Sequence, residues 1–150
     1  MSAVSVKAQG DVTAKWDFKN DLPAGIQETT NYQKTTVDIP STVEGVSMHV
    51  DATHGKLYCI GRNNAQFNSG TLLQVPVKST RDIVVVENYP NYRGYTVGGV
   101  AATADVNEHR ATTDEVAKGY VEIKATDSGY LYGVQVTFVS AIATKELYST

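Results

Sequence analysis

The chain has 150 residues, about the length of one domain, and 41% of them are hydrophobic while only 19% are charged. This balance excludes a disordered polyelectrolyte, and a formal net charge of −3 without a basic block argues against a nucleic-acid backbone as partner. A single cysteine excludes an internal disulfide and a multi-cysteine zinc site, and no apolar run approaches the roughly 18 residues of a membrane span.

Residues branched at the β-carbon dominate the composition, with 20 Val and 17 Thr against only 6 Leu. These side chains fit a pleated surface and lose rotamer freedom in helices, so they favour strands. The chain also contains 12 Gly, which suit tight turns. We therefore predict an all-β domain.

Short strands separated by polar segments are predicted in the first half of the chain. The first covers residues 15–18, and a long irregular segment at residues 20–32 follows it. Alternating apolar and polar residues are typical of a half-buried strand. On this pattern we predict strands at residues 35–39, 46–52, 57–61 and 72–77, with a polar, amide-rich loop at residues 62–70.

The second half of the chain continues the pattern. Residues 82–87 are almost all Val and Ile, which predicts a strand buried on both faces, and residues 89–94 form a turn around a proline. Residues 101–117 give no clear signal, and we predict no helix of convincing length. Strands at residues 120–124 and 130–138 are predicted to form a hairpin around Asp-Ser-Gly. Roughly eight to eleven short strands predict an antiparallel, jelly-roll-like β-sandwich.

One domain is predicted. The β-sandwich occupies residues 15–140, between an N-terminal extension at residues 1–14 and a C-terminal linker at residues 141–150. Residues 1–10 lack the charged and apolar regions of a signal peptide.

Residue patterns for catalysis are weak. Cys59 lies in an apolar strand, which predicts a small buried hydrophobe rather than a nucleophile. His49, His54 and His109 are far apart in the sequence and form no zinc motif, so we predict surface histidines. Carboxylates such as Glu122 cannot be paired from the sequence into the acid and base of a glycosidase. We therefore predict that the domain is not an enzyme.

Aromatic and amide side chains are the remaining signal. A sugar ring packs its apolar C–H face on an aromatic ring, and its hydroxyls bind amides and charges. We predict that Phe67, Tyr120 and one of Tyr89 and Tyr92 stack on sugar rings. The predicted hydrogen-bonding residues are Asn64, Gln66, Asn68 and Glu122. Four other rings are predicted to pack with the core, namely Trp16, Tyr95, Tyr130 and Tyr132.

Three parts of the chain resemble a known family. They are GKL followed by NAQFNSGT and VPV in residues 55–77, YTVGG with AAT in residues 95–103, and GYVEI with YLYGV in residues 119–134. Together they resemble the β-sandwich carbohydrate-binding modules of secreted plant-polysaccharide-degrading enzymes of gut bacteria. Such modules occur on endo-xylanases and beside pectin lyases and pectin esterases. The resemblance covers residues 46–138.

The resemblance implies a monomeric, non-catalytic module that holds a larger xylanase-type enzyme on insoluble plant cell wall. It also implies a location outside the cell or on the bacterial cell surface. Many such modules carry a structural calcium ion, for which Asp17, Asp51 and Asp105 are the candidate ligands.

The charge pattern favours a neutral polysaccharide such as xylan. A binder of anionic galacturonan should gather basic residues on one face. The 13 basic residues here are scattered, and only Arg62 and Arg93 are candidates for a cluster. The alternatives are a pectin-binding module on the same fold, a structural spacer without a glycan site, and a small hydrolase or esterase.

Overall fold

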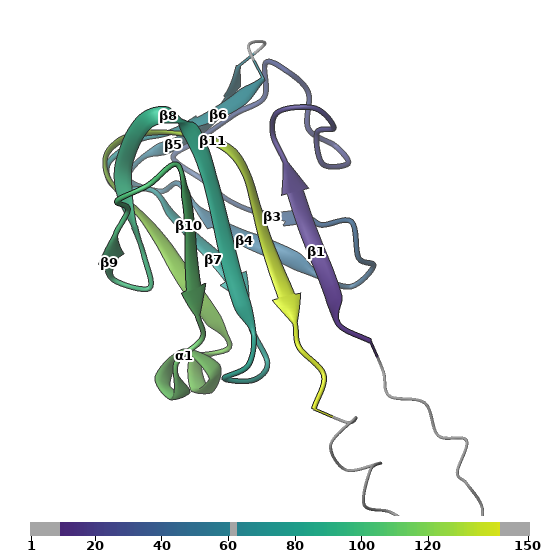
Figure 1. The fold of residues 1–150 in the computed structure, drawn as a ribbon. Coiled ribbons are helices and arrows are strands. Elements are labelled where there is room, and N and C mark those ends of the chain that lie inside the picture. The colour runs from purple at the N-terminus through teal and green to yellow at the C-terminus, as the bar shows by residue number, and fades with distance from the viewer. Residues whose placement is uncertain (1–9, 61–62, 142–150) are drawn as a thin grey trace, which may run out of the picture.

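A computed structural model of the chain describes residues 10–60 and 63–141. It confirms the predicted all-β class: antiparallel strands form a nearly closed sheet that folds over into a sandwich (Figure 1). In the described part of the chain the elements are β1 (Val12–Asp17), β2 (Asn31–Gln33), β3 (Thr36–Pro40), β4 (Ser47–Asp51), β5 (Lys56–Ile60), β6 (Asn64–Phe67), β7 (Leu72–Pro76), β8 (Ile83–Val97), β9 (Val100–Ala101), β10 (Val106–Arg110), α1 (Thr113–Lys118) and β11 (Tyr120–Phe138).

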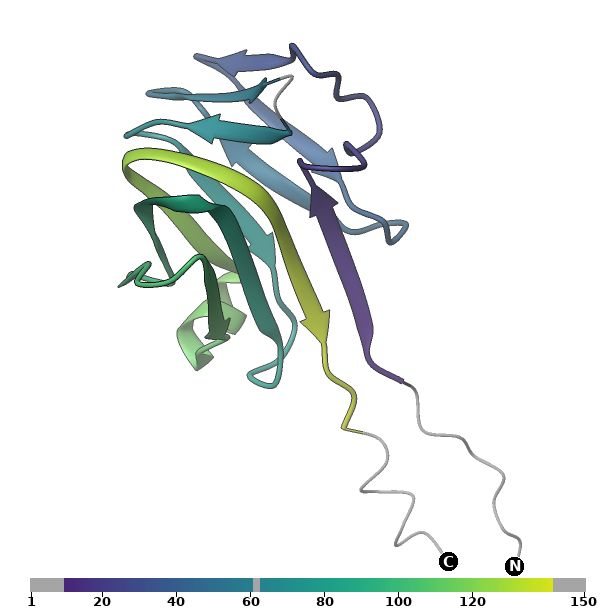
Figure 2. The same cartoon turned by 45° about the horizontal axis from the view of Figure 1, so that its top comes forward.

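The two longest strands, β8 and β11, pass through both layers of the sandwich. The first part of β11 lies between β7 and the end of β8, and its last part lies between β1 and the start of β8. Its middle pairs with β6, which continues the sheet to β5 and β2. Three shifts of register with β8 accompany the change of layer, and β11 bends sharply there (Figure 2).

This continuous strand corrects the predicted hairpin at Asp-Ser-Gly. Pairing between β11 and β8 resumes at the last residue of this run, with Gly129 opposite Arg93, so the chain bends there without reversing. The predicted turn around Pro90 is likewise wrong, because it lies inside β8. Asn91 takes a φ of 72° there, in the left-handed region that Asn tolerates better than most residues.

Two other strand predictions change. The segment predicted as the amide-rich loop contains β6. In the segment predicted to be buried on both faces, Val84 and Val86 are buried, whereas Ile83 and Val85 are only half-buried. The second difference arises because one face of this layer lies outside the sandwich.

The core confirms the predicted packing of three residues. Trp16 is fully buried, and its Nε1 donates a hydrogen bond of 2.8 Å to the Ile39 carbonyl, which ties β1 to β3. Tyr95 is buried, and burial raises its pKa to about 12. Cys59 is buried as well, and burial raises the pKa of its thiol to about 11, so it is not an activated nucleophile.

The two ends of the described chain run side by side. Val12 pairs with Phe138 across β1 and β11, and both chain ends leave the same end of the sandwich (Figures 1 and 2). The domain begins before the predicted boundary at residue 15, because Ala14 is already buried in β1. The predicted linker lies outside the described residues from residue 142 onward.

A short helix, α1, follows β10, and its residue Glu115 makes a polar contact with His109 of β10. Thr112 caps it in a capping box with Glu115. The Glu115 Oε1 lies 2.7 Å from Nε2 of His109, and both side chains are nearly buried, so the predicted surface position of His109 is wrong. Burial raises the pKa of the Glu115 carboxyl, but hydrogen bonds with His109 and the Thr112 backbone outweigh it and lower the pKa below its usual value.

Gly98→Ala should destabilise the fold through this contact. A methyl group at residue 98 would meet the His109 ring at 2.2 Å and the Glu115 carboxylate at 2.8 Å, at a φ of 58°. We expect a loss of about 2 kcal/mol or more in urea unfolding. Gly99→Ala is the matched control, because its φ is 81° but nothing lies within 4 Å of an added methyl group. An equal loss in the two variants would show that backbone conformation, not the clash, sets the effect.

Candidate functional site

An open hollow of about 420 Å³ lies where β5, β6, β8 and β11 meet. We call it the tyrosine hollow. Side chains without charge line it, half of them tyrosines. They are Ile60, Asn64, Gln66, Tyr89, Tyr92 and Tyr130.

The tyrosines of this hollow hold one another in place. The Tyr92 and Tyr130 ring centroids lie 4.6 Å apart at 77°, and those of Tyr89 and Tyr92 lie 5.5 Å apart at 70°. Edge-to-face contacts of this kind are attractive and restrict each ring. Tyr89 and Tyr92 nevertheless remain 40% and 46% exposed, so ring surface is available to a ligand.

Asp105 anchors the segment of β8 that carries two of these rings. Its Oδ1 accepts hydrogen bonds from the Asn91 backbone N–H at 3.0 Å, from Arg93 Nε at 3.0 Å and from Asn88 Nδ2 at 3.2 Å. Asn88 Nδ2 also donates to the Tyr89 carbonyl. The bond from Asn91, followed by the bond from Arg93, holds the pKa of Asp105 below its usual value, so the anchor is charged at neutral pH.

Asn64 brings a buried acceptor to the hollow. Its side chain is 5% exposed, and none of the donors in the described residues reaches its Oδ1. An unsatisfied buried acceptor costs about 1–3 kcal/mol, so a hydroxyl donor at this point would be stabilised. The hollow therefore combines ring faces with an amide whose buried oxygen lacks a donor among the described residues, and a ligand hydroxyl would reach this oxygen after a turn of the Asn64 side chain.

Four of the predicted site residues come together in this hollow, namely Tyr89, Tyr92, Asn64 and Gln66. Asn68 does not, because it follows β6 and lines a separate hollow beside His54 and Lys56. Tyr120 and Glu122 lie at the start of β11, far along the strand from Tyr130. They lie on the outer side of the layer of β3, β4 and β7, where Glu122 is opposite Gln74.

The predicted stacking role of Phe67 is wrong. The ring is fully buried and lies 5.8 Å from the Tyr95 ring. Phe67 and Ala65 point inward from β6, and Gln66 between them points outward. Gly129 on β11 leaves room for the ring, since an added methyl group there would lie 2.3 Å from it.

Sequence reasoning missed Tyr130 as a site residue. The expected hairpin placed it on the same face as the core residues of the returning strand. The register shift between Leu131 and Gly133 reverses the alternation, so Leu131 points inward and Tyr130 points outward, opposite Gln66 of β6. Only the pairing with β6 and β8 reveals this, and no local pattern signals it.

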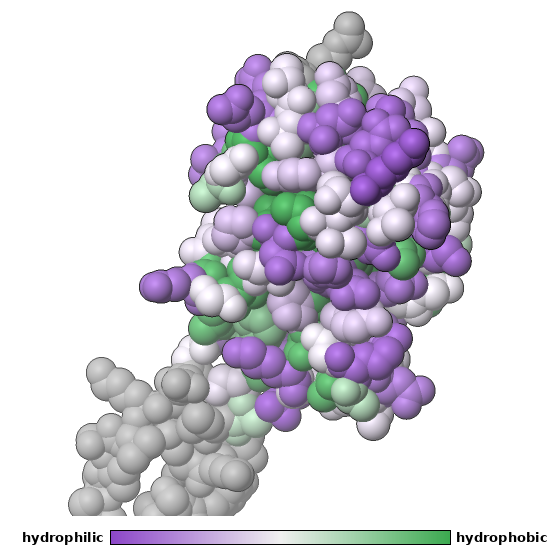
Figure 3. Space-filling model, turned by 180° about the vertical axis from the view of Figure 1, so that it is seen from behind, coloured by the Kyte–Doolittle hydropathy of each residue, from purple (hydrophilic) through white to green (hydrophobic). Residues whose placement is uncertain are grey.

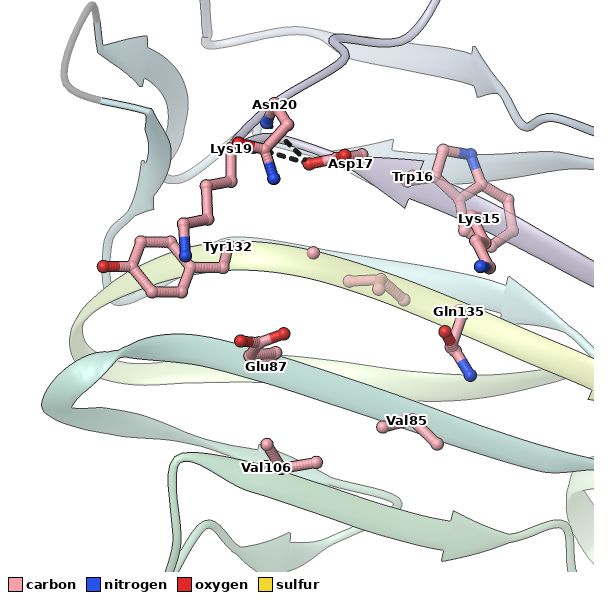
Figure 4. Close-up of a pocket in the computed structure, with 12 residues that line it drawn as sticks. Lys15, Trp16, Asp17, Lys19, Asn20, Val85, Glu87, Val106, Tyr132 and Gln135 are labelled. Atoms are coloured by element: carbon pink, nitrogen blue, oxygen red, sulfur yellow. Dashed lines mark hydrogen bonds between the residues drawn. The ribbon is translucent and has the colours of Figure 1, made fainter.

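A second hollow of about 250 Å³ is lined by residues of β1, β8, β10 and β11 (Figure 4). We call it the charged hollow. Tyr132 lines it and lies 5.6 Å from Tyr89 of the tyrosine hollow. The Lys19 Nζ lies 4.4 Å from the centre of the Tyr132 ring and therefore covers one ring face. The charged groups of this hollow are balanced, comprising Lys15, Lys19, Asp17 and Glu87.

Figure 3 shows the molecule from behind the view of Figure 1, and the hydrophobic residues on that side form small, separate patches in a mostly hydrophilic surface. Of the predicted stacking rings, Tyr120 lies outside the tyrosine hollow. The ring of Tyr120 has the Lys118 Nζ 5.2 Å from its centre. The tyrosine hollow is therefore the better candidate site.

The predicted calcium ligands have local roles. Asp17 Oδ1 accepts the backbone N–H groups of Lys19 and Asn20, and Asp51 Oδ1 accepts that of Thr53. Within residues 10–60 and 63–141, no three His, Cys, Asp or Glu side chains gather as metal ligands. A calcium ion therefore stays a prediction from the resemblance.

In comparisons with protein-family models, curated proteins and solved structures, no match to this chain was found. The described residues also include no helix with the length and apolar character needed to cross a membrane. The geometry of the tyrosine hollow is thus the basis for assigning a function.

Asp105→Ala should weaken the fold in a pH-dependent manner. Because the folded-state pKa of Asp105 is lowered, its stabilising effect is present above its unfolded-state pKa and is lost as the pH falls through the folded value. We expect the variant to have a lower urea midpoint than the original chain at about pH 7, and the difference to shrink at about pH 2. Asp127→Ala, at an exposed position on β11, is the control. A difference that stays constant with pH would contradict a charged anchor.

Proposed function

We propose that the chain is a non-catalytic polysaccharide-binding module, that its ligand is xylan, and that the tyrosine hollow binds it. The observation that carries the proposal is the cluster of partly exposed tyrosine rings beside the Asn64 amide, whose buried oxygen lacks a donor among the described residues. A second part of the proposal is that the module holds an attached glycoside hydrolase on plant cell wall outside the cell.

The chemistry of a pyranose matches the two kinds of surface in the hollow. Its C–H face packs on the exposed rings of Tyr89 and Tyr92, and its hydroxyls donate to Asn64 Oδ1 and exchange hydrogen bonds with Gln66. The rings are fixed before binding by their mutual contacts, which lowers the entropy lost on binding. A shallow site of this kind binds weakly by itself, and tethering to an enzyme raises its effective concentration.

The electrostatics of the hollow support a neutral polymer. Among the described residues, none of the side chains that line it carries a charge. Arg93, on the same segment of β8, already bonds to the Asp105 carboxylate and to the Thr103 carbonyl. Arg62, the other basic residue considered for binding galacturonan, lies outside the described residues. Xylan therefore fits the hollow better than galacturonan does.

Affinity electrophoresis against several polysaccharides tests this function. We expect arabinoxylan and glucuronoxylan to retard the protein, and homogalacturonan, mannan and β-glucan to leave it unretarded. A chelator in the gel should reduce retardation if a structural calcium ion supports the fold. Retardation by homogalacturonan would favour the pectin-binding alternative, and no retardation would favour a structural spacer. Turnover of a chromogenic xyloside or of acetylated xylan would contradict a non-catalytic role.

Variants of the hollow test the site. Tyr92→Ala and Tyr130→Ala should each weaken xylo-oligosaccharide binding at least about tenfold, or about 1.4 kcal/mol, because each removes a ring and the support of its neighbour. Tyr120→Ala is the matched control, since it removes a half-buried tyrosine from the same strand, outside the hollow. Titration calorimetry measures all three. An equal loss in the control would place the site on the layer of β3, β4 and β7.

A further inference from the structure

A line of side chains extends from the tyrosine hollow across the neighbouring strands. Tyr130 of β11 lies opposite Gln66 of β6, and Gln66 lies opposite Tyr58 of β5. On the far side of β5, Tyr58 lies opposite Asn31 of β2. Directly opposed residues in adjacent strands share one face of the sheet, so these four side chains form one row across four strands.

Tyr58 faces outward in this row. Its neighbours along β5, Leu57 and Cys59, are buried, whereas Tyr58 is only half-buried. Ile60 shares this outer face of β5 by the alternation of the strand, and it forms part of the wall of the tyrosine hollow. Tyr58 therefore lies next to the hollow but outside it.

The row also has the spacing of an extended ligand. Neighbouring strands lie about 4.8 Å apart, so Tyr58 and Tyr130 are about 10 Å apart with Gln66 between them. On the other side of Tyr130, the Tyr92 ring continues the row at 4.6 Å. The row therefore has the Tyr58 ring at one end, the rings of Tyr130 and Tyr92 at the other, and the Gln66 amide between them. This arrangement suits a ligand made of successive sugar units.

Lys56 adds a donor to the outer end of the row. It precedes Tyr58 by two residues on the same face, and its Nζ lies 5.9 Å from the centre of the Tyr58 ring. At this distance the ammonium group lies at the outer limit of a cation–π contact. The ammonium group therefore lies over the ring, and a sugar that stacks on that face of Tyr58 would displace it and accept hydrogen bonds from it.

We propose that Tyr58 forms a further sugar-stacking subsite, so that the ligand is the interior of an extended polysaccharide chain running across β11, β6 and β5. This inference rests on the proposed polysaccharide-binding function and adds the direction and minimum length of the ligand. A chain end or a single sugar would be held by the tyrosine hollow alone.

Calorimetric titration with xylobiose, xylotetraose and xylohexaose tests the subsite. For the original chain we expect affinity to rise with length until the ligand reaches Tyr58. Tyr58→Ala should lower affinity for xylohexaose about tenfold and leave that for xylobiose unchanged. Tyr58→Leu keeps an apolar side chain on β5 but removes the ring, and it should lose affinity for xylohexaose in the same way. Agreement between the two variants would show that the loss comes from the missing ring and not from misfolding. Tyr120→Ala, outside the row, should bind all three ligands normally.

The outcomes separate the subsite from the function as a whole. If the original chain binds xylohexaose and both Tyr58 variants bind it equally well, the subsite is wrong and the proposed function stands. The same holds if affinity is independent of ligand length. If the original chain binds none of the three, both proposals fail.

Discussion

The antiparallel pairing of β8 with β11 is the constraint on which the rest of the structure depends. It runs from Thr137 opposite Ile83 in one layer to Ile123 opposite Val97 in the other, so the two strands carry the chain around the edge of the sandwich together. Three register shifts interrupt the pairing at the corner, but it resumes with Gly129 opposite Arg93 and Leu131 opposite Asn88, so the two strands stay together around the bend. The bend also leaves a free edge of β11 at which β6 pairs, and this third contact brings β5 and β2 beside the corner.

Two local features allow the strands to bend at the corner, and both also shape the candidate site. At Gly129 the lack of a side chain leaves room for the Phe67 ring beneath β11. The ring fills the space in the core that the bend of β11 would otherwise leave empty. Opposite it, the left-handed backbone of Asn91 is held by the carboxylate of Asp105. Residues that flank these two points, Tyr130 and Tyr92, are consequently turned outward toward each other. The same features that allow the bend therefore expose and fix the rings, and strain at a bend is often found beside a binding site.

Sequence patterning predicted the parts of the molecule that depend on local alternation. The burial of Trp16 and Cys59 and the class of the fold follow from runs of apolar residues that the reader can find in the printed chain. The site could be predicted only in part, because a register shift reverses which residues face the core. Tyr130 was expected inside for this reason. Phe67 was expected at the surface because its amide-rich segment was predicted to be a loop, whereas in β6 it alternates with Gln66 and points inward with Ala65.

The placement of the site relative to the chain ends fits a tethered binding module. The tyrosine hollow lies at the bend of β11, whereas Val12 and Phe138 lie together at the other end of that strand (Figure 1). A domain joined beyond either end would leave the row from Tyr92 to Tyr58 open to a long polymer. Because the row crosses the strands, its contacts come from four separate segments of the chain. The backbone ladder fixes Tyr130, Gln66 and Tyr58. Tyr92 lies between the paired residues Asn88 and Arg93, in the segment of β8 that Asp105 anchors. Rigid placement of this kind allows a site with few contacts to gain affinity, since little conformational entropy is lost when the polymer binds.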